Sequence, residues 1–220
     1  MAQAPQFLTS GSGEPDRNCA ICPRLAEFVA QSKRDNPDWF AAPVPTFGDR
    51  NARLLVVGLA PGLKGANRTG RPFTGDYAGD LLYKTLGAFG FAGGTFDARP
   101  DDDLRLIDCA VTNAVRCVPP ANKPTGAEIK NCRQFLTARI QTFPKLRAIV
   151  CLGRIAHTSV IAALGGRQAD HPFGHGHQTA LGAISVFDSY HCSRYNTNTG
   201  RLTEPMFHDV FAAVRAHLDD

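Results

Sequence analysis

Short apolar segments alternate with helical patterns along this chain, and no other feature of the sequence constrains the fold as strongly. The apolar segments have the continuous hydrophobic character of strands buried on both faces, and they span residues 54–58, 106–110, 148–152 and 183–188. The helical patterns span residues 79–89, 125–143, 154–164 and 205–218. Strands that alternate with helices pair in parallel, so the sequence predicts an α/β fold. We expect a three-layer α/β/α sandwich with a central four-stranded parallel sheet.

The composition is that of an ordinary globular protein. Of the 220 residues, 43% are hydrophobic and 20% are charged, which argues against disorder. We therefore expect a single domain over residues 1–220, with a flexible segment at 1–16. No apolar run approaches the roughly 20 residues that cross a membrane, and the first residues lack the features of a signal peptide. The sequence therefore predicts a cytoplasmic protein without a membrane partner.

The charge of the chain is mildly basic, with a net value of +4. Of the 24 basic residues 18 are Arg, the side chain that makes bidentate contacts to phosphate. Genome composition also enriches Arg, so the charge alone leaves nucleic-acid binding an open alternative.

Polar loops follow three of the predicted strands at their carboxyl ends. They span residues 58–80 (GLAPGLKGANRTGRPFTGDYAGD), 112–117 (TNAVRC) and 189–203 (SYHCSRYNTNTGRLT). Ligands of open parallel sheets bind at this edge, so we expect the three loops to converge on one cleft. Glycines in the first loop let a ligand approach the backbone closely. The loop lacks the GxxxxGK[ST] pattern of a P-loop, although another kind of phosphate cradle remains an alternative.

Four side chains in these loops are candidates for chemistry on a nucleobase. Phe73 either offers a stacking platform or belongs to the core. Asp76 is either a functional carboxylate or the N-cap of the helix that follows, and one residue can serve as both. Asn113 either reads the edge of a base or satisfies the amides of a turn. His191 lies in a polar loop, which makes it a better catalytic candidate than the histidines on predicted helices.

Seven cysteines are present, and an odd number without a signal peptide argues against a disulfide framework. Cys19 and Cys22 form a CxxC pair, and Cys117 with Cys132 provides a second pair in polar surroundings. Four thiolates satisfy either a zinc ion or an iron–sulfur cluster, and their chemistry alone does not choose between the two. Cys192 has a basic neighbourhood in the sequence, which makes it a candidate reactive thiol.

Taken together, these motifs resemble those of the uracil-DNA glycosylase superfamily, and specifically of its fifth family, the UdgB type. The resemblance covers nearly the whole chain and rests on the early CxxC, GLAPG, GANRTGRPFTGD, TNAVRC and the loop that begins at His191. It implies a four-stranded parallel sheet between helices and a [4Fe–4S] cluster. The cluster ligands that it implies are Cys19, Cys22, Cys117 and Cys132.

Two positions depart from the pattern of the wider superfamily. Ala60 stands where several glycosylase families have an Asp or Asn, and the resemblance implies that Asp76 acts instead. The usual HPS sequence reads His191-Cys192-Ser193, and the loss of proline loosens the backbone preference of this loop. The histidine and the serine of the pattern are both retained.

The resemblance implies a DNA repair enzyme that flips a damaged base into a pocket and hydrolyses its N-glycosidic bond. We expect uracil and other deaminated bases such as hypoxanthine, in double-stranded DNA, as substrates, and no obligate protein partner. No Lys in the motifs is placed to form a Schiff base, so we expect a monofunctional enzyme. The expected catalytic residues are Asp76 and His191. The expected base-binding residues are Gly58, Ala60, Gly62, Phe73 and Asn113, and the expected DNA-binding residues are Arg68, Arg71, Ser193, Arg194, Tyr195 and Arg201.

Two other classes of protein remain open. A non-catalytic nucleic-acid-binding module with an Fe–S cluster or zinc explains the Cys and Arg residues, but it leaves Asp76, Asn113 and His191 without a role. An α/β enzyme that binds nucleotide phosphates predicts recognition of phosphate rather than of a base.

Overall fold

A computed structural model describes residues 6–8 and 13–220 of the chain. Its helices and strands follow one another as α1 (Pro23–Asp35), β1 (Phe47–Gly48), β2 (Leu54–Gly58), α2 (Ala66–Thr69), α3 (Tyr77–Ala88), β3 (Ala92–Gly93), β4 (Arg105–Leu106), β5 (Cys109–Asn113), η1 (Pro120–Asn122), α4 (Gly126–Gln141), β6 (Ala148–Leu152), α5 (Arg154–Ala163), η2 (Gln168–Asp170), β7 (Gln178–Leu181), β8 (Ile184–Ser189), α6 (Arg194–Asn198) and α7 (Glu204–Asp219).

The central sheet is mixed and has six strands in the order β1-β5-β2-β6-β8-β7. The four inner strands run parallel to one another, whereas β1 and β7 pair antiparallel with β5 and β8 at the two edges. The prediction of a four-stranded parallel sheet is therefore corrected to a six-stranded mixed sheet. β1 is only two residues long, and β7 is half-buried, so neither has the continuous apolar character of the inner strands.

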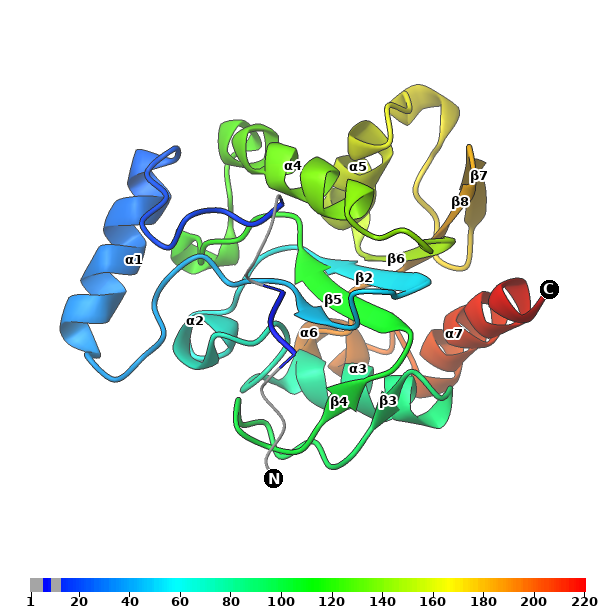
Figure 1. Cartoon of the computed structure of the whole chain (residues 1–220), viewed down its shortest axis with the longest axis horizontal. Coiled ribbons are helices and arrows are strands. Elements are labelled where there is room, and N and C mark those ends of the chain that lie inside the picture. Colours follow the sequence, from blue (N-terminus) through cyan, green and yellow to red (C-terminus); the bar gives the residue numbers. More distant parts are fainter. Residues whose placement is uncertain (1–5, 9–12) are drawn as a thin grey trace.

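Helices cover both faces of this sheet (Figure 1). α4 and α5 pack on one face, where Leu136 of α4 and Val160 of α5 belong to one buried cluster. α3 and α7 pack on the other face, where Leu82 of α3 and Phe207 of α7 belong to a second cluster. Each fully buried side chain of this kind contributes on the order of 1.5–3 kcal/mol to the hydrophobic stabilisation of the fold. The chain is thus an α/β protein with three layers.

Several helices begin at residues that satisfy their first backbone amides. Thr125 caps α4 through the capping box with Glu128, in which each side chain bonds the other residue's amide. Ser193 and Thr203 cap α6 and α7 with their hydroxyl groups. Within the described part of the chain, no helix is both long and apolar enough to cross a membrane.

The second predicted strand, at 106–110, is displaced in the structure. β4 ends at Leu106, and β5 begins at Cys109. Asp108 interrupts the run because its φ of 54° is left-handed and its carboxylate accepts hydrogen bonds from N and Nε of Arg53, at 2.9 and 2.6 Å. The displacement makes Asn113 the last residue of β5, so its side chain lies at the carboxyl edge of the sheet.

Residues 1–16, for which we expect flexibility, are packed where the structure describes them. Leu8 is buried, and Phe7 forms an isolated bridge with Phe47. The carboxylate of Glu14 pairs with Arg116 at 2.7 Å and with Arg139 at 2.9 Å. The rest of this expectation, at residues 1–5 and 9–12, lies outside the described residues.

Candidate active site

A cavity of about 560 Å³ opens at the carboxyl edge of the sheet, beyond β2, β5 and β8. This volume is within the usual range for sites that take a small molecule or a base. The cavity brings together six of the residues predicted for catalysis and base binding, namely Ala60, Gly62, Phe73, Asp76, Asn113 and His191. Ser193 and Arg194 line it as well. The three polar loops therefore converge on one cavity. They follow the parallel strands β2, β5 and β8, whose carboxyl ends lie at the same edge of the sheet.

Phe73 forms one wall of this cavity. It is 6% exposed, and its φ of 53° is a left-handed value that a bulky residue rarely adopts. The ring lies directly over Gly58. A Cβ at that position would overlap Cζ of Phe73 and stand 2.5 Å from Oδ1 of Asn113, so a larger residue would clash with both. Glycine at the end of β2 therefore makes room for an aromatic face and an amide side by side.

Asp76 lies at the mouth of the cavity. Its carboxylate points toward the glycines of the first loop, since a Cβ at Gly62 would stand 3.0 Å from Oδ2 and one at Gly65 would stand 2.5 Å from it. Asp76 occupies the N-cap position of α3, but its side chain forms no capping hydrogen bond. Although the residue is exposed, desolvation by the surrounding loops raises the pKa of the carboxyl above its ordinary 3.8. The nearby amides of Ala78 and Gly79 oppose this rise without forming a capping hydrogen bond. The carboxylate therefore faces the cavity rather than acting only as a helix cap.

His191 follows β8, and its ring lies beside that of Phe73 in the lining of the cavity. The two rings are stacked, with centroids 6.1 Å apart and an angle of 26° between their planes. Nδ1 of His191 is buried and has no hydrogen-bond partner in the described part of the chain. Burial lowers the pKa of His191 from 6.5 to about 4, so the imidazole is neutral near pH 7. Asn196 holds the loop in place by donating a hydrogen bond to the backbone oxygen of His191 at 2.8 Å.

These two groups predict an acid limb in the pH profile of the reaction. Asp76 is ionised only above its raised pKa, and His191 is neutral only above its lowered pKa of about 4. Both functional forms are therefore lost as the pH falls, and neither is lost as the pH rises through 6.5. Single-turnover rates measured across this range should reach a plateau above the acid limb. An inflection near 6.5 that disappears in His191→Gln would contradict the neutral state of His191.

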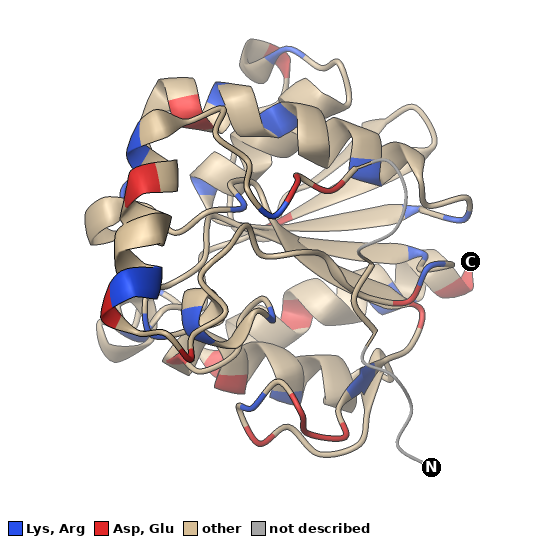
Figure 2. Cartoon of the chain, turned by 60° about the vertical axis from the view of Figure 1, so that its left-hand side comes forward, with Lys and Arg blue, Asp and Glu red and all other residues tan. Residues whose placement is uncertain are grey.

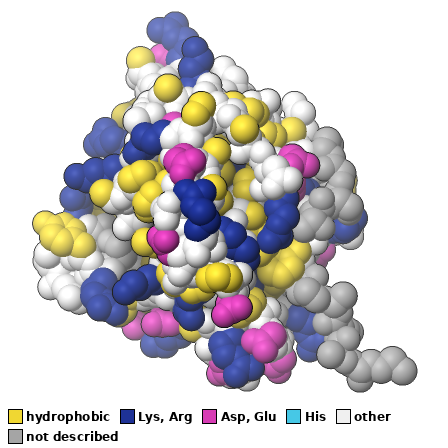
Figure 3. Space-filling model, turned by 90° about the vertical axis from the view of Figure 1, so that its left-hand side faces the viewer, with side chains coloured by type: hydrophobic (Ala, Val, Ile, Leu, Met, Phe, Trp, Pro, Cys, Tyr) yellow, Lys and Arg dark blue, Asp and Glu magenta, His cyan; other side chains and the backbone are white. Residues whose placement is uncertain are grey.

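Cationic and aromatic side chains form the rim of the site. The guanidinium of Arg194 lies 5.3 Å from the ring centre of Tyr77, and both residues line the cavity. The guanidinium of Arg201 lies 4.7 Å from the ring centre of Tyr190, and these two residues line an adjoining pocket that shares His191. Tyr195 projects from α6 and is 73% exposed. Lys and Arg side chains also spread over the face that carries α1 and α2, between hydrophobic side chains (Figure 3). Such a surface suits a ligand that carries both phosphates and bases.

Two interpretations of the sequence are wrong at this site. Arg71, expected to bind DNA, is 1% exposed in its side chain and forms an ion pair with Asp102, so it does not reach an outside phosphate. Cys192, a candidate reactive thiol, is fully buried, and its Sγ donates a hydrogen bond to the backbone oxygen of Ala78 at 3.4 Å. Burial also raises the pKa of Cys192, which keeps the thiol protonated. Arg68, in contrast, is exposed.

The four cysteines predicted as cluster ligands line one small cavity beside α1 and α4. They are Cys19, Cys22, Cys117 and Cys132. Burial raises the pKa of Cys117 to about 12 and that of Cys132 to about 11. The amide of Arg116 donates to Sγ of Cys132 at 3.3 Å, and Nδ2 of Asn131 donates to Sγ of Cys22 at 3.8 Å. Among the described residues, no three His, Cys, Asp or Glu side chains are gathered closely enough to hold a single metal ion.

Sequence reasoning missed some residues of the base-sized cavity, notably Tyr77 and Asn122. Asn122 ends the η1 turn in a left-handed conformation with φ of 55°, which the sequence PPANKP does not reveal. Tyr77 is adjacent to Asp76, but its contact with Arg194 joins the first residues of α3 and α6, which are more than a hundred residues apart, and no local pattern signals it.

Comparisons with known proteins identify the family of this chain. A family model described as the uracil DNA glycosylase superfamily matches residues 45–215. A type-5 uracil-DNA glycosylase of Thermus thermophilus is 47% identical over 204 residues, which cover 90% of this chain and 92% of the relative. A type-5 uracil-DNA glycosylase of Pyrobaculum aerophilum is 39% identical over 203 residues, with coverage of 90% and 88%. A type-4 uracil-DNA glycosylase of Archaeoglobus fulgidus is 35% identical over 114 residues, which cover 51% and 49%.

The fold and the cavity define an α/β protein with a base-sized cavity at the carboxyl edge of its sheet. The matches show more closely that the chain belongs to the uracil DNA glycosylase superfamily, and within it to the type-5 family.

Proposed function

We propose that this protein excises uracil from DNA by hydrolysing the N-glycosidic bond. The observation that carries the proposal is the convergence of Phe73, Asp76, Asn113 and His191 on one cavity. A stacking surface, an amide, a carboxylate and a neutral imidazole are the groups that base recognition and glycosidic cleavage require. The identity of 39–47% to type-5 relatives supports the same reaction.

The target base is recognised after it leaves the helical stack. Flipping costs a few kcal/mol, and the cost is lowest for a mismatched base such as uracil opposite guanine. Phe73 stacks on the flipped base, and Asn113 bonds its pairing edge. Ala60 and Gly62 present little side chain, so the base lies close to the backbone. Arg194, Tyr195 or Arg201 fills the gap that the base leaves in the duplex or holds the flanking phosphates.

Cleavage transfers the electrons of the C1′–N1 bond to the base and leaves an oxocarbenium-like sugar. The neutral imidazole of His191 donates a hydrogen bond to O2 of the departing uracil anion. Asp76 stabilises the cationic sugar and orients the water whose oxygen adds to C1′, while the proton of that water passes to solvent. None of the described residues that line the cavity is a lysine, so the reaction ends at an abasic site with both strands intact.

The direct test of this proposal is incubation with a duplex that contains one uracil, followed by alkali. We expect strand scission at the uracil position only after the alkali step, because alkali breaks the strand at an abasic site. A duplex with hypoxanthine tests the broader range of deaminated bases that we also propose. A non-catalytic binding module predicts the opposite result, with retention of the duplex and no alkali-sensitive position.

We also propose a [4Fe–4S] cluster on Cys19, Cys22, Cys117 and Cys132. The hydrogen bonds to two of these sulfurs support an anionic group there. Arg116 lines the same cavity, and its buried Nε and Nη2 have no hydrogen-bond partner among the described residues. These positively charged donors therefore also suit an anionic group. One zinc ion needs its sulfurs about 2.3 Å from a single centre, whereas a cubane binds each thiolate on a separate iron. The bound cluster supplies cohesion between α1, α4 and the segment after β5.

We propose that residues 1–220 act as one domain on double-stranded DNA in the cytoplasm, without an obligate protein partner. The cysteine site supports one domain, because it joins the start of the chain to α4. All seven cysteines are free, which suits a reducing compartment.

DNA binding by the rim arginines predicts a change in the salt dependence of affinity. Arg194→Ala and Arg201→Ala should each reduce the slope of log K against log salt by about 1, because each loses one phosphate contact. Base preference should change little. Arg167→Ala is the matched control, since this exposed residue follows α5 at the opposite edge of the sheet. Equal slopes in all variants would place the DNA surface elsewhere.

A further inference from the structure

We infer that the buried pair Arg71–Asp102 is a positioning device for the base platform Phe73. This inference rests on the proposed function, in which Phe73 binds the flipped base. It assigns part of the base specificity of the cavity to residues that do not line the cavity. The pair is bidentate, with both N–O distances at 2.6 Å, and the two side chains are 1% and 0% exposed. A buried ion pair of this kind is weak evidence for stability, because desolvation offsets most of its attraction.

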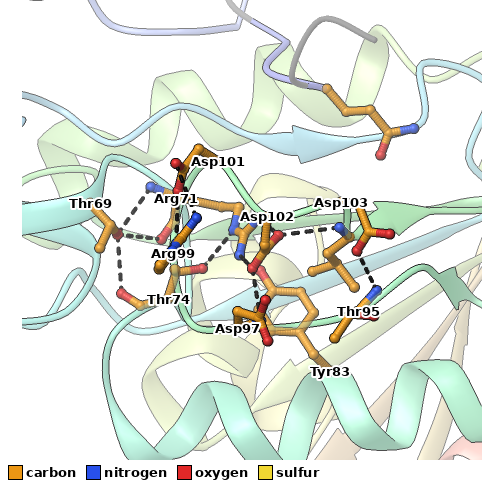
Figure 4. A network of polar contacts seen from close by, with 12 residues as sticks. Thr69, Arg71, Thr74, Tyr83, Thr95, Asp97, Arg99, Asp101, Asp102 and Asp103 are labelled. Carbon is orange, nitrogen blue, oxygen red and sulfur yellow. Dashed lines mark hydrogen bonds and ion pairs between the residues drawn. The ribbon is translucent and has the colours of Figure 1, made fainter. Parts of the chain in front are cut away.

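The guanidinium of Arg71 connects two segments that are far apart in the sequence (Figure 4). Its carbon lies 5.2–5.8 Å from the ring centres of Phe47, Tyr83 and Phe96. Asp102 also accepts hydrogen bonds from the amides of Asp97 and Leu104, at 3.0 and 3.2 Å. The loop before β4, which carries a run of acidic positions (Figure 2), is thereby tied to the segment that carries Phe73.

The network reaches Phe73 through both of its neighbours in the chain. Nε of Arg71 donates to Oγ1 of Thr74 at 2.8 Å, and Thr74 in turn donates to the carbonyl of Pro72 at 3.2 Å. The hydroxyl of Tyr83 donates to the same carbonyl at 2.6 Å. Residues 72 and 74 are therefore both held by the Arg71 network, and the residue between them has the left-handed φ of 53°.

Packing against α3, β2 and His191 also restricts Phe73. A Cβ at Gly79 would clash with the carbonyl of Phe73, so the first turn of α3 lies directly against its backbone. The ring occupies the space over Gly58 and stacks on His191. A left-handed backbone at a non-glycine residue persists only where the surroundings impose it. The Arg71–Asp102 pair is the part of those surroundings that lies outside the cavity.

The test measures how strongly the protein prefers a duplex with uncleavable 2′-fluoro-2′-deoxyuridine over the same duplex with cytosine at that position. This ratio of dissociation constants reports the base pocket and cancels contacts to phosphate. Tyr83→Phe should lower the ratio about three- to tenfold, the equivalent of one net hydrogen bond. Asp102→Asn should lower it at least as far. In a Phe73→Leu background, the same two changes should alter the ratio less than about twofold, because their effect passes through the ring.

Asp108→Asn is the matched control, since it also removes the carboxylate partner of an arginine, Arg53, without contact to the Phe73 segment. It should lower the melting temperature and leave the ratio unchanged. If Asp102→Asn does not fold, Tyr83→Phe decides the result. An unchanged ratio in folded Tyr83→Phe would overturn the inference. So would a fall of the ratio by about three- to tenfold when Tyr83→Phe is added to Phe73→Leu, since the effect would then not pass through the ring. A wild-type protein without preference for the uracil duplex would overturn the proposed function and this inference with it.

Discussion

Replacement of Asp76 by asparagine is expected to slow uracil release about 100- to 1,000-fold under single-turnover conditions. Asparagine has the shape of aspartate but no charge, so the cavity keeps its form while the stabilisation of the cationic sugar is lost. That charge develops only in the transition state, so DNA affinity should stay close to the wild-type value. The measurement compares the maximal rate with the dissociation constant for the same duplex.

Asp80→Asn is the matched control for this prediction. Asp80 lies on the first turn of α3, one turn after Asp76, and is exposed. Asp80 does not line the cavity, but its charge helps to raise the pKa of Asp76. On the plateau of the pH profile, where Asp76 is ionised in both proteins, the rate of Asp80→Asn should remain near the wild-type value. If Asp76→Asn keeps a normal rate but melts earlier, Asp76 is only a helix cap. The catalytic stabilisation would then fall to His191 and the loop amides.

Loss of a cluster ligand is expected to remove the iron and to destabilise the fold strongly. Cys132→Ala should yield a protein without brown colour and with a much lower melting temperature, because metal binding at a structural site is coupled to folding. The wild-type protein should contain about four iron atoms per chain. The colour and iron content after anaerobic preparation are the measurements.

Cys151→Ala provides the control for the cluster variant. Cys151 is fully buried in β6, away from the four predicted ligands, so its replacement should retain colour and iron. Stoichiometric zinc without iron in the wild-type protein would contradict the cluster. In that case all four thiolates would have to bind one zinc ion, each with its sulfur about 2.3 Å from the metal.

The inner strands of the sheet could be predicted from the sequence, whereas its edges could not. β2 and β6 have the predicted bounds because strands buried on both faces have continuous apolar sequences. β1 consists of two residues whose pairing with β5 is set by tertiary contacts. The start of β5 also depends on such a contact, since Asp108 turns the chain by binding Arg53.

The residues that meet in the cavity could be predicted from the sequence, whereas the burial of individual arginines could not. Loops at the carboxyl ends of parallel strands must meet at one edge, so Phe73, Asn113 and His191 could be placed together from the sequence. Arg68 and Arg71 look alike in the same loop, yet one is exposed and the other is buried against Asp102. The partner of Arg71 lies 31 residues away, and no local pattern distinguishes an arginine that has such a partner.

Direct measurement of free uracil tests the central claim most simply. The protein is mixed in excess with a duplex that contains one uracil opposite guanine, and the released base is quantified by chromatography. Hydrolysis in the described cavity predicts one free uracil for each abasic site, with both strands intact until alkali is added. A protein that binds this duplex but releases no uracil, or that breaks the strand without alkali, would contradict a monofunctional glycosylase.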